Sequence, residues 1–245
     1  IDKMLVLDQW IVSKTADLQS QVVNEYDEYN FHLAMKMILN FCTNDLGGFY
    51  LDIIKDRQYT TQTNSLARRS AQSALYQIAH AMVRWIAPVL SFTAEEVWQH
   101  LPGASNESVF LQTWYEGLEG NFNNHSIEVA RDINVHLRKE LEEMRSDKVI
   151  GSSLDAEVDI YCSDENYQAL GELKDELRFV FITSDARIHL LAEKPKEVTD
   201  INKSLAIKVI KSSYQKCVRC WHHREEIGEN EAHKDLCGRC IENVE

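Results

Sequence analysis

Proline and glycine are scarce in this sequence, with three prolines and nine glycines among 245 residues. This scarcity permits long helices and argues against low-complexity linkers. No apolar run approaches the roughly 20 residues that a membrane-spanning helix requires, so we expect no membrane partner. Asp2 and Asp8 interrupt the first ten residues, which therefore do not resemble a signal peptide. Position 1 is not methionine, as expected of a segment of a longer protein.

Motifs of common catalytic sites are also missing. The sequence has no Gly-x-x-x-x-Gly-Lys-Ser/Thr loop, no Gly-x-Gly-x-x-Gly after a strand, and no metalloprotease spacing among its nine histidines. Carboxylate pairs such as Glu142-Glu143 are typical of solvated helix faces, and Glu95-Glu96 fits the first turn of a helix. The chain by itself gives no sign of enzymatic activity.

The apolar pattern predicts a mainly α fold. In residues 1–117 it has the helical period and predicts a helical bundle. We expect a first helix with one apolar face, a second over about 31–45 that is broken or bent at Gly47-Gly48, and a long third helix ended by Pro88 near Ala87. Thr93 with Glu96 has capping-box spacing and predicts a short helix before Pro102-Gly103. The apolar faces of the first and third helices comprise Leu7, Ile11, Leu18, Val22 and Tyr26, and Leu75, Ile78, Met82, Ile86 and Val89.

The pattern changes in the second half. Residues 118–151 are predicted to form a polar linker followed by an amphipathic helix, with a domain boundary over 117–126. Residues 152–213 are predicted to form a small α+β module, and residues 214–245 a cysteine-rich tail. Within the module we expect a half-buried strand over 156–162, a helix over 164–177, β-rich runs over 178–183 and 186–192, and a last strand over 205–209.

Four of the six cysteines lie in the tail as two Cys-x-x-Cys pairs: Cys217, Cys220, Cys237 and Cys240. Each two-residue gap forms a turn that places both sulfurs on one side, and two turns complete a tetrahedral shell. The spacing predicts one structural Zn²⁺ per chain with no open position for water. The alternatives are free or disulfide-bonded cysteines, or a shell in which His222, His223 or His233 replaces a cysteine. The isolated Cys42 and Cys162 fit core packing.

The net charge of −13 argues against a protein that coats nucleic acid nonspecifically with its whole surface. Residues 201–224, however, contain no acidic residue. Cations and aromatic rings beside a metal site suit contacts with phosphates and unstacked RNA bases. The alternative is that the lysines only solvate a strand and Trp221 packs over the cysteines. The candidate RNA contacts are Lys208, Lys211, Lys216, Arg219, Trp221 and Arg224, with Lys203 and Tyr214 in the same window.

Several segments resemble a known family. Residues 40–59, NFCTNDLGGFYLDIIKDRQY, and residues 74–102 resemble the anticodon-binding helical domain of the class I synthetases for isoleucine, valine, leucine and methionine. Residues 216–240, KCVRCWHHREEIGENEAHKDLCGRC, resemble the C-terminal zinc module of bacterial isoleucyl-tRNA synthetases. Residues 147–161 resemble the junction segment of the same family.

The resemblance implies an anticodon-binding helical bundle over 1–117, a junction module over 152–213 and a zinc module over 214–245. It implies the four tail cysteines as zinc ligands and the tRNA for isoleucine as partner. The family's His-Ile-Gly-His and Lys-Met-Ser-Lys-Ser motifs do not occur here. The resemblance therefore places ATP binding, catalysis and editing in other domains of the parent chain. It also implies a cytoplasmic monomer.

Another function class fits the same residues. A zinc-containing helical bundle could dock a protein partner without contacting RNA. Salt separates the two hypotheses, because phosphate contacts weaken steeply as salt rises whereas an apolar protein interface does not. A free-standing metalloenzyme is disfavoured by the closed set of ligands.

Overall fold

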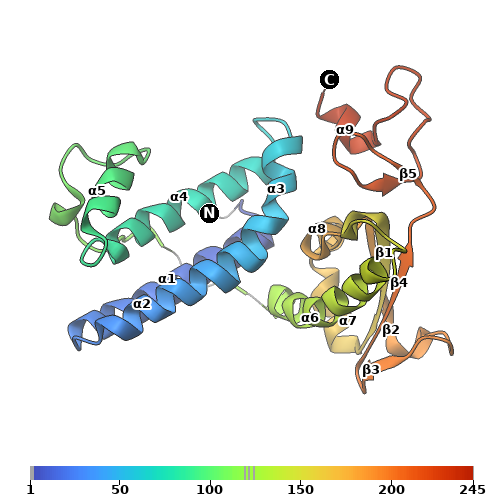
Figure 1. Cartoon of the computed structure of the whole chain (residues 1–245), viewed down its shortest axis with the longest axis horizontal. Helices are drawn as coiled ribbons and strands as arrows, with labels where there is room; N and C mark the ends of the chain where they lie inside the picture. Colours follow the sequence, from blue (N-terminus) through green and yellow to red (C-terminus); the bar gives the residue numbers. More distant parts are fainter. Residues whose placement is uncertain (1–2, 119, 121, 124, 245) are drawn as a thin grey trace. The chain divides into compact units, whose positions relative to one another are not determined.

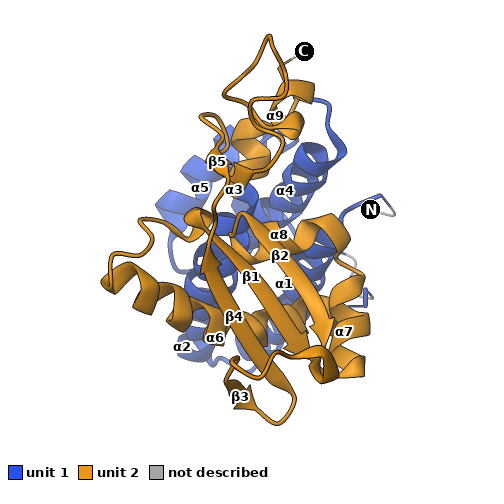
Figure 2. Cartoon of the chain, turned by 90° about the vertical axis from the view of Figure 1, so that its right-hand side faces the viewer, with its two compact units in different colours: residues 1–54, 63–124 blue, residues 55–62, 125–245 orange. Residues whose placement is uncertain are grey.

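The computed structural model describes residues 3–118, 120, 122–123 and 125–244. They form two compact units, unit 1 from residues 1–54 and 63–124 and unit 2 from residues 55–62 and 125–245 (Figure 2). Helices predominate, accompanied by one small sheet and the cysteine-rich tail, which confirms the predicted fold class (Figure 1). Residues 119, 121 and 124 of the predicted boundary lie outside the described residues. None of the described helices is both long and apolar enough to cross a bilayer.

Unit 1 is built from helices around a core rich in aromatic residues. Its elements are α1 (Val6–Asp27), α2 (Phe31–Asn40), the π-helix η1 (Phe41–Tyr50), the start of α3 (Leu51–Thr60), α4 (Leu66–Ile86), α5 (Ser91–His100) and the short η2 (Val109–Leu111). The predicted apolar face of α1 is confirmed, since Leu7, Ile11 and Val22 are buried. α1 packs against α2 and α4, and Trp10 and Trp85 are fully buried in this core.

Two details of the third and fourth predicted helices differ. α4 ends at Ile86 as Pro88 predicts. Of its predicted apolar face Ile78 is buried, but the most buried residues of the helix are Ala71, Ala74, Ala81 and Trp85. Small residues let two helices approach closely, and Val89 remains 47% exposed. α5 begins at Ser91, so Thr93 with Glu96 is not its capping box.

The sheet of unit 2 has the strand order β2-β1-β4-β3. Strand β1 pairs in parallel with β2 and antiparallel with β4, which pairs antiparallel with β3. A separate hairpin, β5-β6, opens the tail. The elements are α6 (His125–Ser146), β1 (Ala156–Cys162), α7 (Asp164–Gly171), α8 (Leu177–Phe181), β2 (Asp185–Leu190), β3 (Asp200–Asn202), β4 (Leu205–Lys211), β5 (Gln215–Lys216), β6 (His223–Arg224) and α9 (Gly238–Glu242), with single 3₁₀ turns η3 (Ser153–Asp155), η4 (Lys174–Glu176) and η5 (Leu191–Glu193).

The amphipathic helix and the strands over 156–162 and 205–209 are confirmed as α6, β1 and β4. The predicted strand over 178–183 is wrong, because these residues form most of α8. A short apolar run does not separate helix from strand by its pattern. Here Leu177, Val180 and Phe181 are buried together on one helical turn, and Ile182 ends it with φ +53°. The predicted helix over 164–177 is split into α7 and η4.

Strand β1 is more deeply buried than its alternation predicts. Glu157 alternates with the apolar Val158 and Ile160, so a half-buried strand would turn it to solvent, but it is 5% exposed. It accepts hydrogen bonds from Arg187 Nη1 and from Ser212 Oγ, each at 2.7 Å. Arg187 also bonds Asp159 through Nε at 2.7 Å. These ion pairs and hydrogen bonds stabilise the charged carboxylates of Glu157 and Asp159, which would otherwise need hydration.

The helix predicted to break or bend at Gly47-Gly48 is not broken there and continues as η1. In a π-helix each N–H bonds the carbonyl five residues earlier, which widens the turn. A Cβ on Gly47 would lie 3.1 Å from the carbonyl oxygen of Cys42, and one on Gly48 would lie 2.9 Å from that of Thr43. The two glycines therefore allow a close approach of consecutive turns rather than a break.

We predict that Gly48→Ala lowers the stability of unit 1 by about 1–3 kcal/mol, because its Cβ would press on backbone that cannot move aside cheaply. Gly171→Ala, where a Cβ would meet nothing within 4 Å, is the matched control and should be neutral or stabilising by up to about 1 kcal/mol. Thermal unfolding followed by circular dichroism measures both. Equal melting temperatures for Gly48→Ala and the parent would contradict the steric role.

Candidate metal centre

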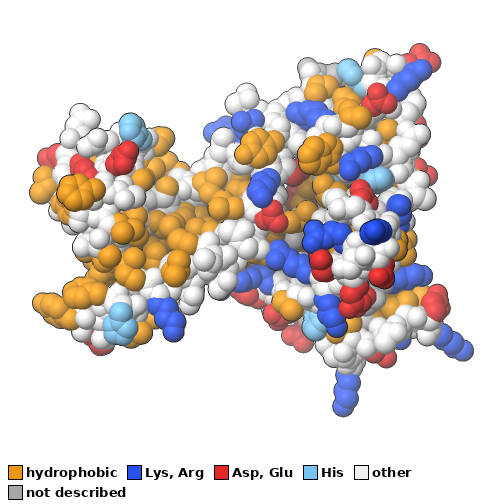
Figure 3. Space-filling model, in the orientation of Figure 1, with side chains coloured by type: hydrophobic (Ala, Val, Ile, Leu, Met, Phe, Trp, Pro, Cys, Tyr) orange, Lys and Arg blue, Asp and Glu red, His pale blue; other side chains and the backbone are white. Residues whose placement is uncertain are grey.

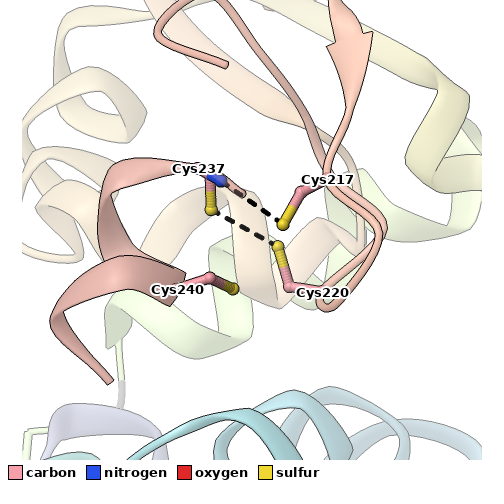
Figure 4. Close-up of side chains that lie close together, drawn as sticks. All are labelled: Cys217, Cys220, Cys237 and Cys240. Atoms are coloured by element: carbon pink, nitrogen blue, oxygen red, sulfur yellow. Dashed lines mark hydrogen bonds between the residues drawn. The ribbon is translucent and has the colours of Figure 1, made fainter. Parts of the chain in front are cut away.

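Four cysteine side chains of unit 2 converge on one point. Cys217 follows β5, Cys220 lies in the turn before β6, Cys237 precedes α9 and Cys240 lies within it. Their sulfurs lie within 4.8 Å of one another, and all four residues are buried. Figure 4 shows the sulfurs turned toward a common centre. The Sγ atoms of Cys220 and Cys237 are 3.6 Å apart, close to the edge of about 3.8 Å expected for a tetrahedron with bonds of about 2.3 Å.

Backbone hydrogen bonds hold the first pair of sulfurs in place. Trp221 N–H donates to the Cys217 carbonyl at 2.9 Å, and Cys217 N–H donates to the His222 carbonyl at 2.9 Å. The chain reverses at Trp221, whose φ is +68°, a left-handed conformation that is uncommon for a side-chain-bearing residue. Cys237 N–H points at Cys217 Sγ at 3.4 Å, as a donor to a thiolate would.

Four buried thiols this close cannot all ionise without a cation. Hydrogen bonds from Cys237 and Cys240 lower the pKa of Cys220. The same bonds, with burial and the charge of Cys220, raise the pKa of Cys240 and bring that of Cys237 to about 11. One thiolate therefore forms at the expense of its neighbours. A divalent cation removes this conflict, because a coordinated thiol is deprotonated outright.

The donor set fits zinc in a structural role. Four thiolates at tetrahedral spacing close the shell and leave no position for water or substrate. Two of the histidines proposed as alternative ligands lie beside backbone carbonyl oxygens instead. His222 Nδ1 lies 3.2 Å from the Cys220 carbonyl oxygen, and His223 Nδ1 lies 2.6 Å from the Tyr214 carbonyl oxygen. Neither they nor His233 belong to the group of converging donors.

The residues around the cluster include a segment that sequence reasoning missed, residues 55–62. Arg239 in α9 makes a bidentate pair with Asp56, at 2.5 Å and 2.8 Å. Arg219 Nη1 donates to the Thr60 carbonyl and lies 3.9 Å from Cys240 Sγ. The backbone N–H of Gln62 donates to Asn243 Oδ1 at 2.6 Å. These partners are more than 150 positions apart in sequence, so no local pattern could reveal them.

Several cations among the predicted RNA contacts are paired with carboxylates. Lys208 lies 3.8 Å from Glu197, Lys216 lies 3.5 Å from Asp155, and Arg224 lies 3.5 Å from Glu226. Figure 3 shows the same mixture, with Lys and Arg interspersed among Asp and Glu over unit 2, on the right of the view. The window that lacks acids in sequence is therefore partly neutralised in space.

Two of the predicted contacts stay open to solvent. Trp221 is 61% exposed and does not cover the cysteines, and Lys216 Nζ lies 5.9 Å from the centre of its ring. Lys211, at the end of β4, is exposed, and no carboxylate among the described residues pairs with it. Arg219, by contrast, is half-buried and committed to Thr60.

Comparison with known proteins gives two family matches. Residues 8–160 match the family described as "Anticodon-binding domain of tRNA ligase". Residues 215–243 match the family described as "Zinc finger found in FPG and IleRS". The second match covers all four converging cysteines.

Individual relatives are similar over almost the whole chain. An isoleucine–tRNA ligase from Ruthia magnifica is 58% identical over 243 residues, which are 99% of this chain and 26% of that protein. The isoleucine–tRNA ligase of Nitrosococcus oceani is 53% identical over 248 residues, again 99% of this chain and 26% of that protein. The chain therefore spans about a quarter of the length of these relatives.

We predict one equivalent of zinc per chain, retained through purification without added metal. Zinc binding to such a site contributes about 10–16 kcal/mol of apparent free energy that is coupled to folding. A chelator should therefore unfold residues 214–245, and Cys240→Ser should lose the metal. Elemental analysis with thiol titration measures both.

Cys42→Ser is the control, since Cys42 lies outside the cluster and is a free cysteine. It should keep its zinc. A native parent chain with clearly less than one equivalent and four freely titratable thiols would contradict the assignment.

Proposed function

The chain belongs to the family of anticodon-binding domains of tRNA ligases, and on that premise we propose that it is the tRNA-binding part of an isoleucine–tRNA ligase. The observation that carries the proposal is the joint presence, in one chain, of the family match over 8–160 and the zinc-finger match over 215–243. The full-length parent would attach isoleucine to its tRNA, as the names of its relatives indicate, and the ATP for this reaction would bind in its catalytic domain. Its catalytic and editing domains would be the other partners, in a cytoplasmic monomer.

In this proposal Cys217, Cys220, Cys237 and Cys240 hold one Zn²⁺ whose role is structural. The metal would fix the turn that carries Trp221 and the helix α9 that carries Arg239. RNA recognition would then use side chains presented by this rigid knuckle and by β4. Trp221 is the strongest candidate, because its ring is 61% exposed and the turn that carries it is held beside the cysteines by backbone hydrogen bonds.

The remaining proposed contacts are Lys208, Lys211, Lys216, Arg219 and Arg224. Lys211 is free to meet a phosphate, whereas Lys208, Lys216 and Arg224 would first exchange a carboxylate partner. Arg219 supports the cluster from the side of Thr60. Its replacement should therefore affect the stability of the tail as well as any RNA contact.

We predict that Trp221→Ala weakens binding of an isoleucine tRNA transcript by about 1–3 kcal/mol, the value of one base stacked on an aromatic ring. Lys211→Ala should weaken binding less and lower the salt dependence by about one counterion. Both variants should keep their zinc. Binding isotherms at several salt concentrations, with metal content for each variant, provide the measurement.

Tyr167→Ala is the matched control, because Tyr167 is a 38% exposed aromatic residue on α7, away from the cysteines. It should bind tRNA like the parent. Unchanged affinity in Trp221→Ala and Lys211→Ala would show that RNA binds to another surface of the chain. A chain that binds no tRNA at all would favour the protein-interaction module.

We also predict that the 245-residue chain alone neither activates isoleucine nor charges tRNA. The physical reason is the lack of any phosphate-binding loop or other nucleotide motif in its sequence. Exchange of label between pyrophosphate and ATP, dependent on isoleucine, is the assay, with a full-length relative as positive control. Exchange by the purified chain would refute the prediction.

A further inference from the structure

Arg178 of α8 lies beside the metal centre and has no carboxylate partner among the described residues, although it is half-buried. Its guanidinium lies 4.6 Å from the centre of the Phe179 ring, and Arg239 of α9 lies 4.9 Å from the centre of the same ring. The ring of His222, two residues after Cys220, lies 5.5 Å from that of Phe179. The side chain of Phe179 therefore contacts both segments that carry the cysteines.

The charges around Arg178 show which anion stabilises it. Burial lowers the pKa of Arg178, and the neighbouring guanidinium groups of Arg224 and Arg239 lower it further, because like charges disfavour the protonated form. Negative charge on Cys220 and Cys237 raises the same pKa. The thiolates of the cluster are therefore the anions that offset the charge of Arg178.

Arg219 is a second cation of this kind and contacts a different sulfur. Its Nη1 lies 3.9 Å from Cys240 Sγ and donates a hydrogen bond to the Thr60 carbonyl. That carbonyl is neutral, and no carboxylate in the described part of the chain pairs with Arg219. Since the side chain is half-buried, its charge also needs an anion nearby.

The charges at the metal centre balance when zinc is bound. Four thiolates and one Zn²⁺ together carry about two negative charges. Two other arginines near the cluster are already offset by carboxylates, since Arg239 pairs with Asp56 and Arg224 lies 3.5 Å from Glu226. The two arginines without carboxylate partners thus supply the positive charge that the metal centre lacks.

We propose that Arg178 and Arg219 are the counter-charges of the metal centre, and that they keep its sulfurs tightly coordinated and chemically inert. A sulfur is a stronger nucleophile when more negative charge resides on it. A guanidinium beside the sulfur withdraws part of that charge, and groups outside the ligand shell influence how strongly the ligands hold their metal. The inference goes beyond the proposed function, because it concerns the metal centre and does not require tRNA.

The first experiment measures how tightly zinc is held. The 245-residue chain, purified with zinc, competes for the metal with a chromophoric chelator. Arg178→Met and Arg219→Met should each lower the zinc affinity by about 10–100-fold, the usual effect of losing a group that supports the ligands. Arg145→Met is the matched control, because Arg145 lies on α6 and pairs with Glu142 at 2.7 Å. It removes the same charge and should leave the affinity unchanged.

The second experiment separates the charge of Arg178 from its packing. Arg178→Lys keeps the positive charge but loses the flat guanidinium that lies against Phe179. It should hold zinc like the parent chain. The zinc-loaded variants are also treated with iodoacetamide, whose carbon bonds to a sulfur as iodide leaves, so that the metal loses a ligand. Zinc release should be faster in Arg178→Met than in the parent and in Arg178→Lys, because more negative charge remains on the sulfurs.

Parent-like affinity and alkylation rate in both methionine variants would overturn the inference, and so would an effect confined to one of them. It would also fail if Arg178→Lys behaved like Arg178→Met, because Arg178 would then act through its packing on Phe179. If Arg178→Met retains no zinc at all, recovery of zinc in Arg178→Lys supports the inference and its absence overturns it. A parent chain without zinc would refute the metal assignment together with this inference, whereas binding of tRNA is measured independently.

Discussion

The bidentate ion pair between Arg239 and Asp56 determines how the cysteine-rich tail is built into unit 2. It joins positions 183 apart in sequence, and both side chains are largely shielded from water. Burial disfavours the charge of Arg239, yet the hydrogen bonds and charge of Asp56 hold its pKa above the ordinary value. Removing one partner of a buried pair costs about 3–5 kcal/mol because it leaves an uncompensated charge. Since Arg239 lies in α9 between Cys237 and Cys240, the pair ties the metal centre to residues 55–62, and the tail is not a free appendage.

Local patterns predicted the elements whose burial follows from their own sequence. The apolar stripe of α1 and the end of α4 at Pro88 needed no distant partner. The failures occurred where the decisive contacts are remote or the geometry is unusual. Residues 177–181 form a helix because three large side chains share one buried turn. The two glycines of η1 allow a wide helix, although glycine pairs usually indicate the end of a helix. Glu157 was expected in solvent, because nothing in β1 itself shows that Arg187 and Ser212 compensate it.

The candidate sites differ in the same way, since a site could be predicted where its residues are close in sequence and not where they are remote. The cysteine cluster could be predicted because its ligands come in two tight turns, so that short spacing fixes the position of each pair of sulfurs. The contacts of the cluster with residues 55–62 could not, because they join positions more than 150 residues apart along the chain. Residues 201–224 contain no acidic residue, but acidic residues from other segments lie beside them in the folded chain. Asp155, Glu197 and Glu226 lie outside this range along the chain but beside its cations in space.

This pairing changes the physical character expected of the RNA interface. Of the cations in residues 201–224, only Lys203 and Lys211 are exposed without a carboxylate or backbone partner among the described residues. Counterion release scales with the number of phosphates neutralised, so a surface with about two free cations gives a shallow salt dependence rather than the steep one expected from six. A chain of net charge −13 also gains little from long-range attraction to a polyanion. Affinity must then come from short-range contacts, and the exposed ring of Trp221 can make a contact of that kind. Shallow salt dependence is thus compatible with RNA binding here. Protection of individual tRNA bases by the chain therefore distinguishes an RNA partner from a protein partner better than the salt dependence of the affinity does.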